Sequence, residues 1–191
     1  TVDCFVGGTG CRWFMIWLIR HPPVALHWQK RCYGSSDVGF SRDGARRAKA
    51  LILQLVDLSP DVIVHSDRKR TRTIAERAAR LLSAELYADP RWRERDFGDW
   101  EGRSWNAIYR ETGNAMDGML CDPEGFRPGG GETTAELVAR SLDGWRNLPE
   151  GKNIAVIAHG GPIAAILANH DNGEIYQLPN YIPQPGSITT V

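Results

Sequence analysis

The chain has 191 residues, 42% of them hydrophobic, and this size and apolar content match one compact domain rather than a fibre or a disordered segment. Lys and Arg together number 23, as do Asp and Glu, so the zero formal net charge provides no long-range attraction to nucleic acid or an anionic membrane. Four cysteines without a C-x-x-C pair, and no apolar run long enough to span a membrane, predict a cytoplasmic protein with free thiols and no zinc site.

The first predicted element is a strand at residues 15–19, an apolar run that ends at Arg20 and His21 before two prolines. Such a run is typical of a strand that is buried on both faces and stops at a functional loop. Residues 1–14 precede this strand and do not begin with Met, so we expect an N-terminal extension there, and its artefactual origin is one hypothesis. The domain itself is expected over residues 15–191.

Helices and strands are predicted to alternate along the next part of the chain. Apolar residues at three-and-four spacing follow Ser41, a typical N-cap residue, and predict a helix that ends near residue 56. The β-branched run 62–64 predicts a second buried strand. Periodic apolar positions over 74–82 predict a second helix.

The segment 90–131 is rich in Trp, Arg, Gly and Pro and has weak periodicity, which predicts a lid or an insertion with a helix over 104–111. A helix from residue 133 or 134 to about 148 follows, then a third strand at 154–158 and a helix over 163–169. Strands that alternate with helices predict an α/β fold, a single three-layer α/β/α domain with a mostly parallel central sheet.

Four basic or titratable side chains lie at the ends of the predicted strands. His21 and His159 come directly after buried strands, and Arg20 and Arg70 lie beside or shortly after such strand ends. Because the carboxyl ends of parallel strands share one edge of a sheet, these groups are expected to converge there. A surface salt bridge or a capping contact would explain a single Arg-His pair, but four groups at matching positions favour a site.

Five motifs occur in a fixed order: LIRH at 18–21, SDRKR at 66–70, ERDFGDWEG at 94–102, PGGGE at 128–132 and HGG at 159–161. Together they resemble the histidine phosphatase superfamily, which includes phosphoglycerate mutases, fructose bisphosphatases and α-ribazole phosphatases. The resemblance extends from about Met15 to the end of the chain. It implies a phosphoglycerate mutase-like fold and a metal-independent phosphatase that acts through a phosphohistidine intermediate.

The resemblance also implies roles for individual residues. His21 is the nucleophile, Glu94 is the acid and base, and four residues contact the phosphate: Arg20, Arg70, His159 and Gly160. Arginine forks suit the charge on phosphoryl oxygens, and a neutral imidazole is a good nucleophile near pH 7. For Glu94, an ordinary surface carboxylate among arginines is the alternative reading. We expect no metal ion and no cofactor, a small phosphorylated metabolite as substrate, and a monomer or homodimer.

The chain departs from the usual superfamily pattern directly after His21. Where the family has Gly, Thr and Asn, this chain has Pro22, Val24 and His27. Proline removes an N–H that would otherwise face the phosphate, whereas His27 offers a replacement donor and is predicted to bind phosphate. The segments 20–25 and 32–37 together instead resemble the α-ribazole phosphatase branch, which makes α-ribazole phosphate a candidate substrate.

Two other functions remain open at this point: a mutase-type phosphotransferase, and a non-catalytic module that binds a phosphorylated ligand. Glu132 is expected to orient His159 or to cap the helix that follows. The remaining histidines, His65 and His170, are expected at surface or turn positions.

Overall fold

A five-stranded sheet forms the centre of the domain. The computed structural model describes residues 14–191, so the extension expected at 1–14 lies, up to residue 13, outside the described residues. The strand order is β3-β2-β4-β1-β5. The strands are β1 (Ile16–Arg20), β2 (Val62–His65), β3 (Glu85–Ala88), β4 (Ile154–Ala158) and β5 (Ile188–Thr190). β1 to β4 are parallel and β5 pairs antiparallel with β1, which confirms a mostly parallel sheet.

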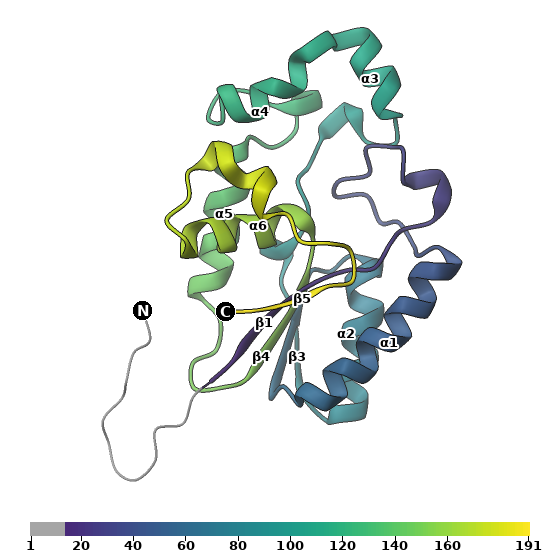
Figure 1. The fold of residues 1–191 in the computed structure, drawn as a ribbon, viewed down its shortest axis with the longest axis vertical. Helices are drawn as coiled ribbons and strands as arrows, with labels where there is room; N and C mark the ends of the chain where they lie inside the picture. The colour runs from purple at the N-terminus through teal and green to yellow at the C-terminus, as the bar shows by residue number, and fades with distance from the viewer. Residues whose placement is uncertain (1–13) are drawn as a thin grey trace.

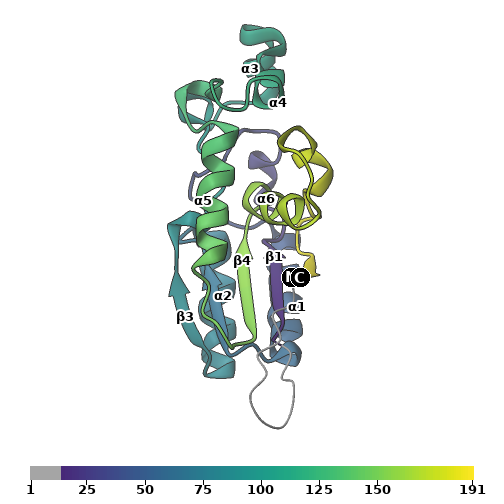
Figure 2. The ribbon, with the colours of Figure 1, turned by 90° about the vertical axis from the view of Figure 1, so that its left-hand side faces the viewer.

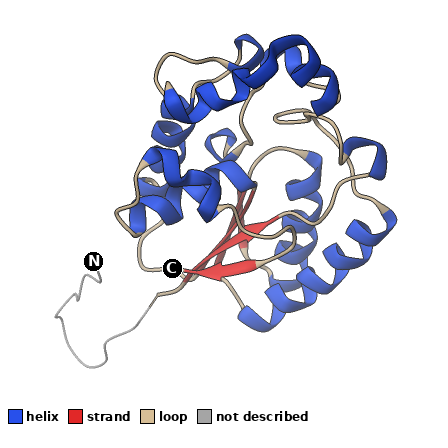
Figure 3. Ribbon diagram, turned by 45° about the horizontal axis from the view of Figure 1, so that its top comes forward, coloured by secondary structure: helices blue, strands red, loops and turns tan. Residues whose placement is uncertain are grey.

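Helices cover both faces of this sheet. Their bounds are α1 (Arg42–Leu58), α2 (Lys69–Leu82), α3 (Trp105–Thr112), α4 (Gly118–Cys121), α5 (Thr134–Arg146) and α6 (Gly160–His170). One hydrophobic cluster joins the sheet to α1 and α2, and a second joins its other face to α5 and α6. Figure 1 shows these helix pairs on opposite sides of the strands, and Figure 3 shows the same three layers by secondary structure. The predicted α/β/α architecture is confirmed.

Local capping signals set where the helices begin. Ser41 caps α1, since its hydroxyl accepts a hydrogen bond from the Gly44 N–H (2.8 Å). Thr133 caps α5 in a capping box with Glu136, so the prediction that Glu132 caps this helix is wrong. α6 begins at Gly160, three residues before the predicted start, because a proline in the first helical turn removes only an N–H that has no intrahelical partner.

Two short strands at the sheet edges were not predicted from the sequence. β3 has four residues, all exposed, and β5 has three residues of which none is fully buried. Neither segment shows an apolar run or a clear alternation of apolar and polar residues, the two patterns that predict a strand from sequence. Their pairing with β2 and β1 defines them instead.

The segment 90–131 lies beyond the carboxyl ends of the strands, and Figure 2 shows α3 and α4 above that end of the sheet. The helix predicted at 104–111 is confirmed as α3, capped by the Ser104 hydroxyl. Buried Trp100 and Ile108 pack with Cys32, so the segment is anchored to the loop after β1. Within residues 14–191, no helix combines the length and the apolar character needed to cross a membrane.

Candidate active site

Three polar side chains meet at the carboxyl ends of neighbouring central strands. His21 follows β1, Ser66 follows β2 and His159 follows β4. Sheet pairing continues past β1 and β2, since the His21 N–H donates to the Ala158 carbonyl (3.2 Å) and the Ser66 N–H to the Ile157 carbonyl (3.3 Å). The two imidazole rings lie edge to face with their centres 5.0 Å apart. The structure thus brings together two histidines that lie far apart in the sequence.

Arg70 is the centre of this cluster and is fully buried in the first turn of α2. Its Nε lies 3.3 Å from His21 Nε2 and 3.2 Å from His159 Nδ1, and it donates to both. Its Nη1 and Nη2 donate to the carbonyls of Ser36 and Gly34, each at 2.6 Å. All three guanidinium nitrogens therefore have a partner, and the orientation of the side chain is defined.

The protonation state of His21 follows from its hydrogen bonds. Its Nδ1 lies 2.7 Å from the Pro22 carbonyl, an acceptor, so Nδ1 carries the proton and Nε2 carries the lone pair. Burial, reinforced by the positive charge of Arg70, lowers the pKa of His21 to about 3. The ring is therefore neutral near pH 7, with an unprotonated Nε2. Pro22 lacks an N–H but still supplies this carbonyl.

A hydrogen-bonded chain holds His159 from the opposite side. Its Nε2 lies 2.6 Å from the Ser66 hydroxyl, which in turn lies 2.8 Å from the Thr71 hydroxyl. Thr71 donates to the Ser66 carbonyl (2.7 Å). Because His159 Nδ1 accepts from Arg70, Nε2 is the protonated nitrogen and donates to Ser66. Burial, and then the charge of Arg70, hold the pKa of His159 well below its ordinary value.

Arg20 approaches the cluster from the last position of β1. Its Nη1 donates to the Pro183 carbonyl (2.6 Å). Its Nε is buried and has no hydrogen-bond partner among the described residues. Gly160 lies against this guanidinium, since a Cβ at that position would be 3.3 Å from Arg20 Cζ. Arg20 therefore keeps one buried donor that a ligand can use.

Glu94 lies at the N-terminus of α6. Its carboxylate accepts from the Gly161 N–H, with Oε1 at 3.1 Å and Oε2 at 3.3 Å. The N–H groups of a helix N-terminus have no intrahelical partner, so they are available to a side-chain carboxyl group there. A Cβ at position 161 would lie 2.4 Å from Glu94 Oε1, so this approach requires glycine. Burial lowers the pKa of Arg70, and the negative charge of Glu94 opposes that effect across the site.

The loop that accepts hydrogen bonds from Arg70 is held by Glu101. The Glu101 carboxylate accepts from the Ser35 N–H (2.7 Å) and from the hydroxyls of Ser35 and Ser36. Gly34 has a φ of +28°, and a Cβ there would lie 2.6 Å from Glu101 Oε1. Only glycine combines this backbone conformation with this close approach. Glu101 thus acts on Arg70 indirectly, by fixing the carbonyls of positions 34 and 36.

Sequence reasoning did not identify Ser66 or Glu101 as parts of this site. Both belong to the motifs, so position in a motif was the available signal, but their partners come from distant segments. Asp37 also contributes, because its Oδ1 accepts from the Lys69 N–H (2.5 Å) at the start of α2. His65 was expected at the surface and is buried, because it ends the central strand β2 and its Nδ1 bonds the Ser66 carbonyl.

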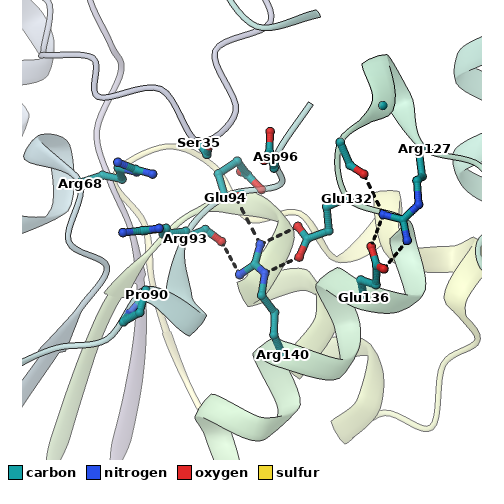
Figure 4. Close-up of a pocket in the computed structure, with 12 residues that line it drawn as sticks. Ser35, Arg68, Pro90, Arg93, Glu94, Asp96, Arg127, Glu132, Glu136 and Arg140 are labelled. Atoms are coloured by element: carbon teal, nitrogen blue, oxygen red, sulfur yellow. Dashed lines mark hydrogen bonds and ion pairs between the residues drawn. The ribbon is translucent and has the colours of Figure 1, made fainter. Parts of the chain in front are cut away.

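A cleft of about 570 Å³ opens beside the cluster (Figure 4). Glu94 lines it, whereas His21, Arg70 and His159 are buried and are not part of its lining. Charged side chains dominate its walls: Arg68, Arg93, Glu94, Asp96, Arg127, Glu132, Glu136 and Arg140. Glu132 forms a two-pronged pair with Arg140 and not with His159, so neither role predicted for it from the sequence is found.

One predicted phosphate-binding residue is exposed, unlike the buried residues of the cluster. His27 is exposed on a short 3₁₀ helix (Leu26–Trp28), and its ring lies 5.5 Å from that of Trp28. No hydrogen bond within residues 14–191 joins His27 to His21, Arg70 or His159. Those residues also contain no group of three or more His, Cys, Asp or Glu side chains arranged to hold a metal ion. His170 is exposed at the end of α6, as expected.

The low pKa of His21 predicts a dependence of stability on pH. Its folded pKa of about 3 lies below the ordinary 6.5, so between these values the unfolded chain binds more protons than the native protein. The stabilisation is complete above pH 6.5 and is lost as the pH falls towards 3. In urea unfolding at pH 7, 6, 5 and 4, wild type should lose about 1 kcal/mol per pH unit relative to His21→Gln. If both proteins lost the same free energy of unfolding as the pH falls, the low pKa of His21 would not be the cause of the dependence.

Comparisons with known proteins agree with the fold and the motifs. The family model for the histidine phosphatase superfamily (branch 1) matches residues 16–191. A curated relative, the probable phosphoglycerate mutase GpmB of Photorhabdus laumondii subsp. laumondii, is 29% identical over 167 residues, which cover 86% of this chain and 75% of the relative.

Two solved structures share the fold. A mycobacterial glucosyl-3-phosphoglycerate phosphatase superposes with a TM-score of 0.81 at 24% identity, covering 93% of this chain and 89% of the other. The α-ribazole phosphatase from Shigella flexneri superposes with a TM-score of 0.81 at 21% identity, with the same two coverages. At these identities the likeness concerns the fold.

Proposed function

The chain belongs to the histidine phosphatase superfamily (branch 1), and from this premise we propose that it hydrolyses a small phosphomonoester through a phosphohistidine on His21. The observation that carries the proposal is the state of His21. Its ring is neutral, its Nδ1 proton is bound by the Pro22 carbonyl, and its Nε2 lone pair faces the Arg70 guanidinium. A nucleophile and a cationic phosphate ligand therefore already lie side by side.

The first step forms a bond between His21 Nε2 and phosphorus and breaks the bond from phosphorus to the leaving oxygen. Phosphoryl oxygens replace the imidazole nitrogens as acceptors for Arg70 Nε, and another accepts from the unpartnered Nε of Arg20. As the phosphoryl group enters, His159, held at Nε2 by Ser66, takes up a proton from water at Nδ1 and donates a hydrogen bond from it, which the negative charge of the phosphoryl group favours.

Glu94 handles the proton in both steps. In its acid form it protonates the leaving oxygen, and as a carboxylate it then accepts a proton from the water that attacks the phosphohistidine. The bond from phosphorus to Nε2 breaks, its electron pair returns to His21, and phosphate leaves. The backbone N–H of Gly161 holds the carboxyl group in place during both transfers. This sequence of steps uses no metal ion.

The substrate is the less defined part of the proposal. α-Ribazole phosphate is one candidate, supported by the resemblance of segments 20–25 and 32–37 to that branch of the superfamily. A mutase-type transfer is the second candidate function, supported by the probable phosphoglycerate mutase among the sequence relatives. The two differ in where the phosphoryl group goes: to water, or back to a second hydroxyl.

Release of inorganic phosphate separates these candidates. We expect the protein to release phosphate from a panel that includes α-ribazole phosphate, glycerol 3-phosphate and 3-phosphoglycerate, without added bisphosphoglycerate and without loss in EDTA. Conversion of 3-phosphoglycerate to its isomer should be slower than phosphate release. Faster isomerisation that depends on added bisphosphoglycerate would instead establish the mutase, and loss of activity in EDTA would contradict a metal-free mechanism.

A further inference from the structure

Four arginines line the cleft, and three of them are committed to carboxylates. Arg140 binds Glu132 through Nε (2.5 Å) and Nη2 (2.8 Å). Arg127 binds Glu136 through both terminal nitrogens. The third, Arg93, binds Asp67 through Nε and Nη2. Two-pronged pairs of this kind occupy the guanidinium groups and leave little capacity for a ligand.

Arg68, the fourth, has no such partner. The nearest carboxylate oxygen is Asp67 Oδ1, 3.9 Å from Arg68 Nε, and both oxygens of Asp67 already accept from Arg93. A distance of 3.9 Å is too long for a hydrogen bond. Arg68 Nε is also buried without a hydrogen-bond partner among the described residues. A buried donor that is unsatisfied in the free protein is costly unless a ligand satisfies it.

The position of Arg68 relates it to the proposed reaction. It is the N-cap residue of α2, two residues before Arg70, so the same helix turn carries both arginines. Glu94, which is proposed to protonate the leaving oxygen, lines the same cleft. Figure 4 shows the Arg68 and Arg93 side chains together on one side of the cleft, with Glu132 on the other. The leaving group of a substrate would therefore extend past Glu94 along this wall.

From this arrangement we propose that Arg68 determines substrate specificity by binding an anionic group, a carboxylate or a second phosphate, on the leaving-group part of the substrate. The inference rests on the proposed phosphatase function and selects among its substrates. It favours acidic phosphomonoesters over those with an uncharged leaving group, such as α-ribazole phosphate. The carboxylates of Glu132 and Glu136 do not oppose such a ligand strongly, because each is neutralised by its own arginine.

Two matched substrate pairs test the inference and distinguish the two anions. 3-Phosphoglycerate and glycerol 3-phosphate differ by a carboxylate, and propanediol bisphosphate and propanediol monophosphate differ by a phosphate. In wild type, kcat/KM should be higher, in at least one pair, for the member whose leaving group carries the additional negative charge. Arg68→Gln should lower kcat/KM for that member by about 10- to 100-fold, the range expected for a charge-assisted hydrogen bond. For the member with an uncharged leaving group, kcat/KM should stay within about threefold of wild type.

Arg72→Gln is the matched control, because it removes another arginine of α2 that does not line the cleft and whose ion pair with Glu76 is 4.0 Å long. It should preserve the preference for the anionic substrate. Equal losses on both members of a pair in Arg68→Gln, or a wild-type preference for uncharged leaving groups, would overturn the inference. Phosphate release separates this from failure of the proposed function: a wild type inactive on phenyl phosphate and on all four of these substrates refutes the phosphatase itself, whereas activity without anion selectivity refutes only the role of Arg68.

Discussion

His21→Ala is expected to lower kcat/KM for any phosphomonoester substrate by about 10⁴-fold or more, the scale of losses seen when a covalent nucleophile is removed. No other imidazole in the cluster can replace it. Nε2 of His159 donates to Ser66, and its Nδ1 accepts from Arg70, so neither nitrogen is in the position that His21 Nε2 occupies. The activity that remains would come from binding and from the arginines alone.

The same variant should fail to form a phosphoenzyme. Wild type that is mixed with a labelled phosphomonoester and quenched in base should carry a label that is stable to alkali and lost in acid, as expected of a phosphoramidate. His21→Ala should carry none. His170→Ala is the matched control, since His170 is exposed at the end of α6. An alkali-stable label of equal intensity in His21→Ala would place the nucleophile elsewhere and refute the proposal.

Arg70→Lys is expected to lower kcat/KM by about 10²- to 10³-fold, although it keeps the positive charge. Arginine here serves two imidazoles and two carbonyls from a rigid planar group, and a single ammonium nitrogen cannot reach all four acceptors. The variant should also be less stable, by about 1–3 kcal/mol for each carbonyl of Gly34 and Ser36 that loses its donor in the interior.

A matched exchange separates the effect of geometry from that of charge. Arg72→Lys, two residues along α2, changes a half-exposed arginine whose ion pair with Glu76 is 4.0 Å long. It should change neither kcat/KM nor the free energy of unfolding measurably. If Arg70→Lys retained activity within about threefold of wild type, charge alone would be sufficient, and the arrangement of the four acceptors would have no catalytic importance.

Much of this architecture was predictable because apolar periodicity is strong in the central elements. The bounds of β4 match residues 154–158 as predicted, and α1 begins after Ser41. The convergence of His21 and His159 followed from one rule, that parallel strands end at a common edge. Edge strands β3 and β5 lacked that signal, since pairing alone defines them.

The hydrogen bonds that define the site were not predictable in the same way. Two of the hydrogen bonds made by Arg70 go to the backbone carbonyls of Gly34 and Ser36, and a carbonyl is present at every position of every sequence. Ser66 contacts His159 and Glu101 contacts Ser35, and each of these partners lies more than sixty residues away in the sequence. Residue types alone do not predict such contacts, because the contacts depend on the tertiary structure.

The acceptor of the His21 proton illustrates what this means for recognising related chains. The Nδ1 proton is bound by the carbonyl of position 22, and proline supplies this carbonyl as the usual glycine would. A search pattern that requires glycine there would discard this protein, although the group that orients the ring is intact. Patterns for this site should therefore fix the arginine-histidine pair and leave the next position open.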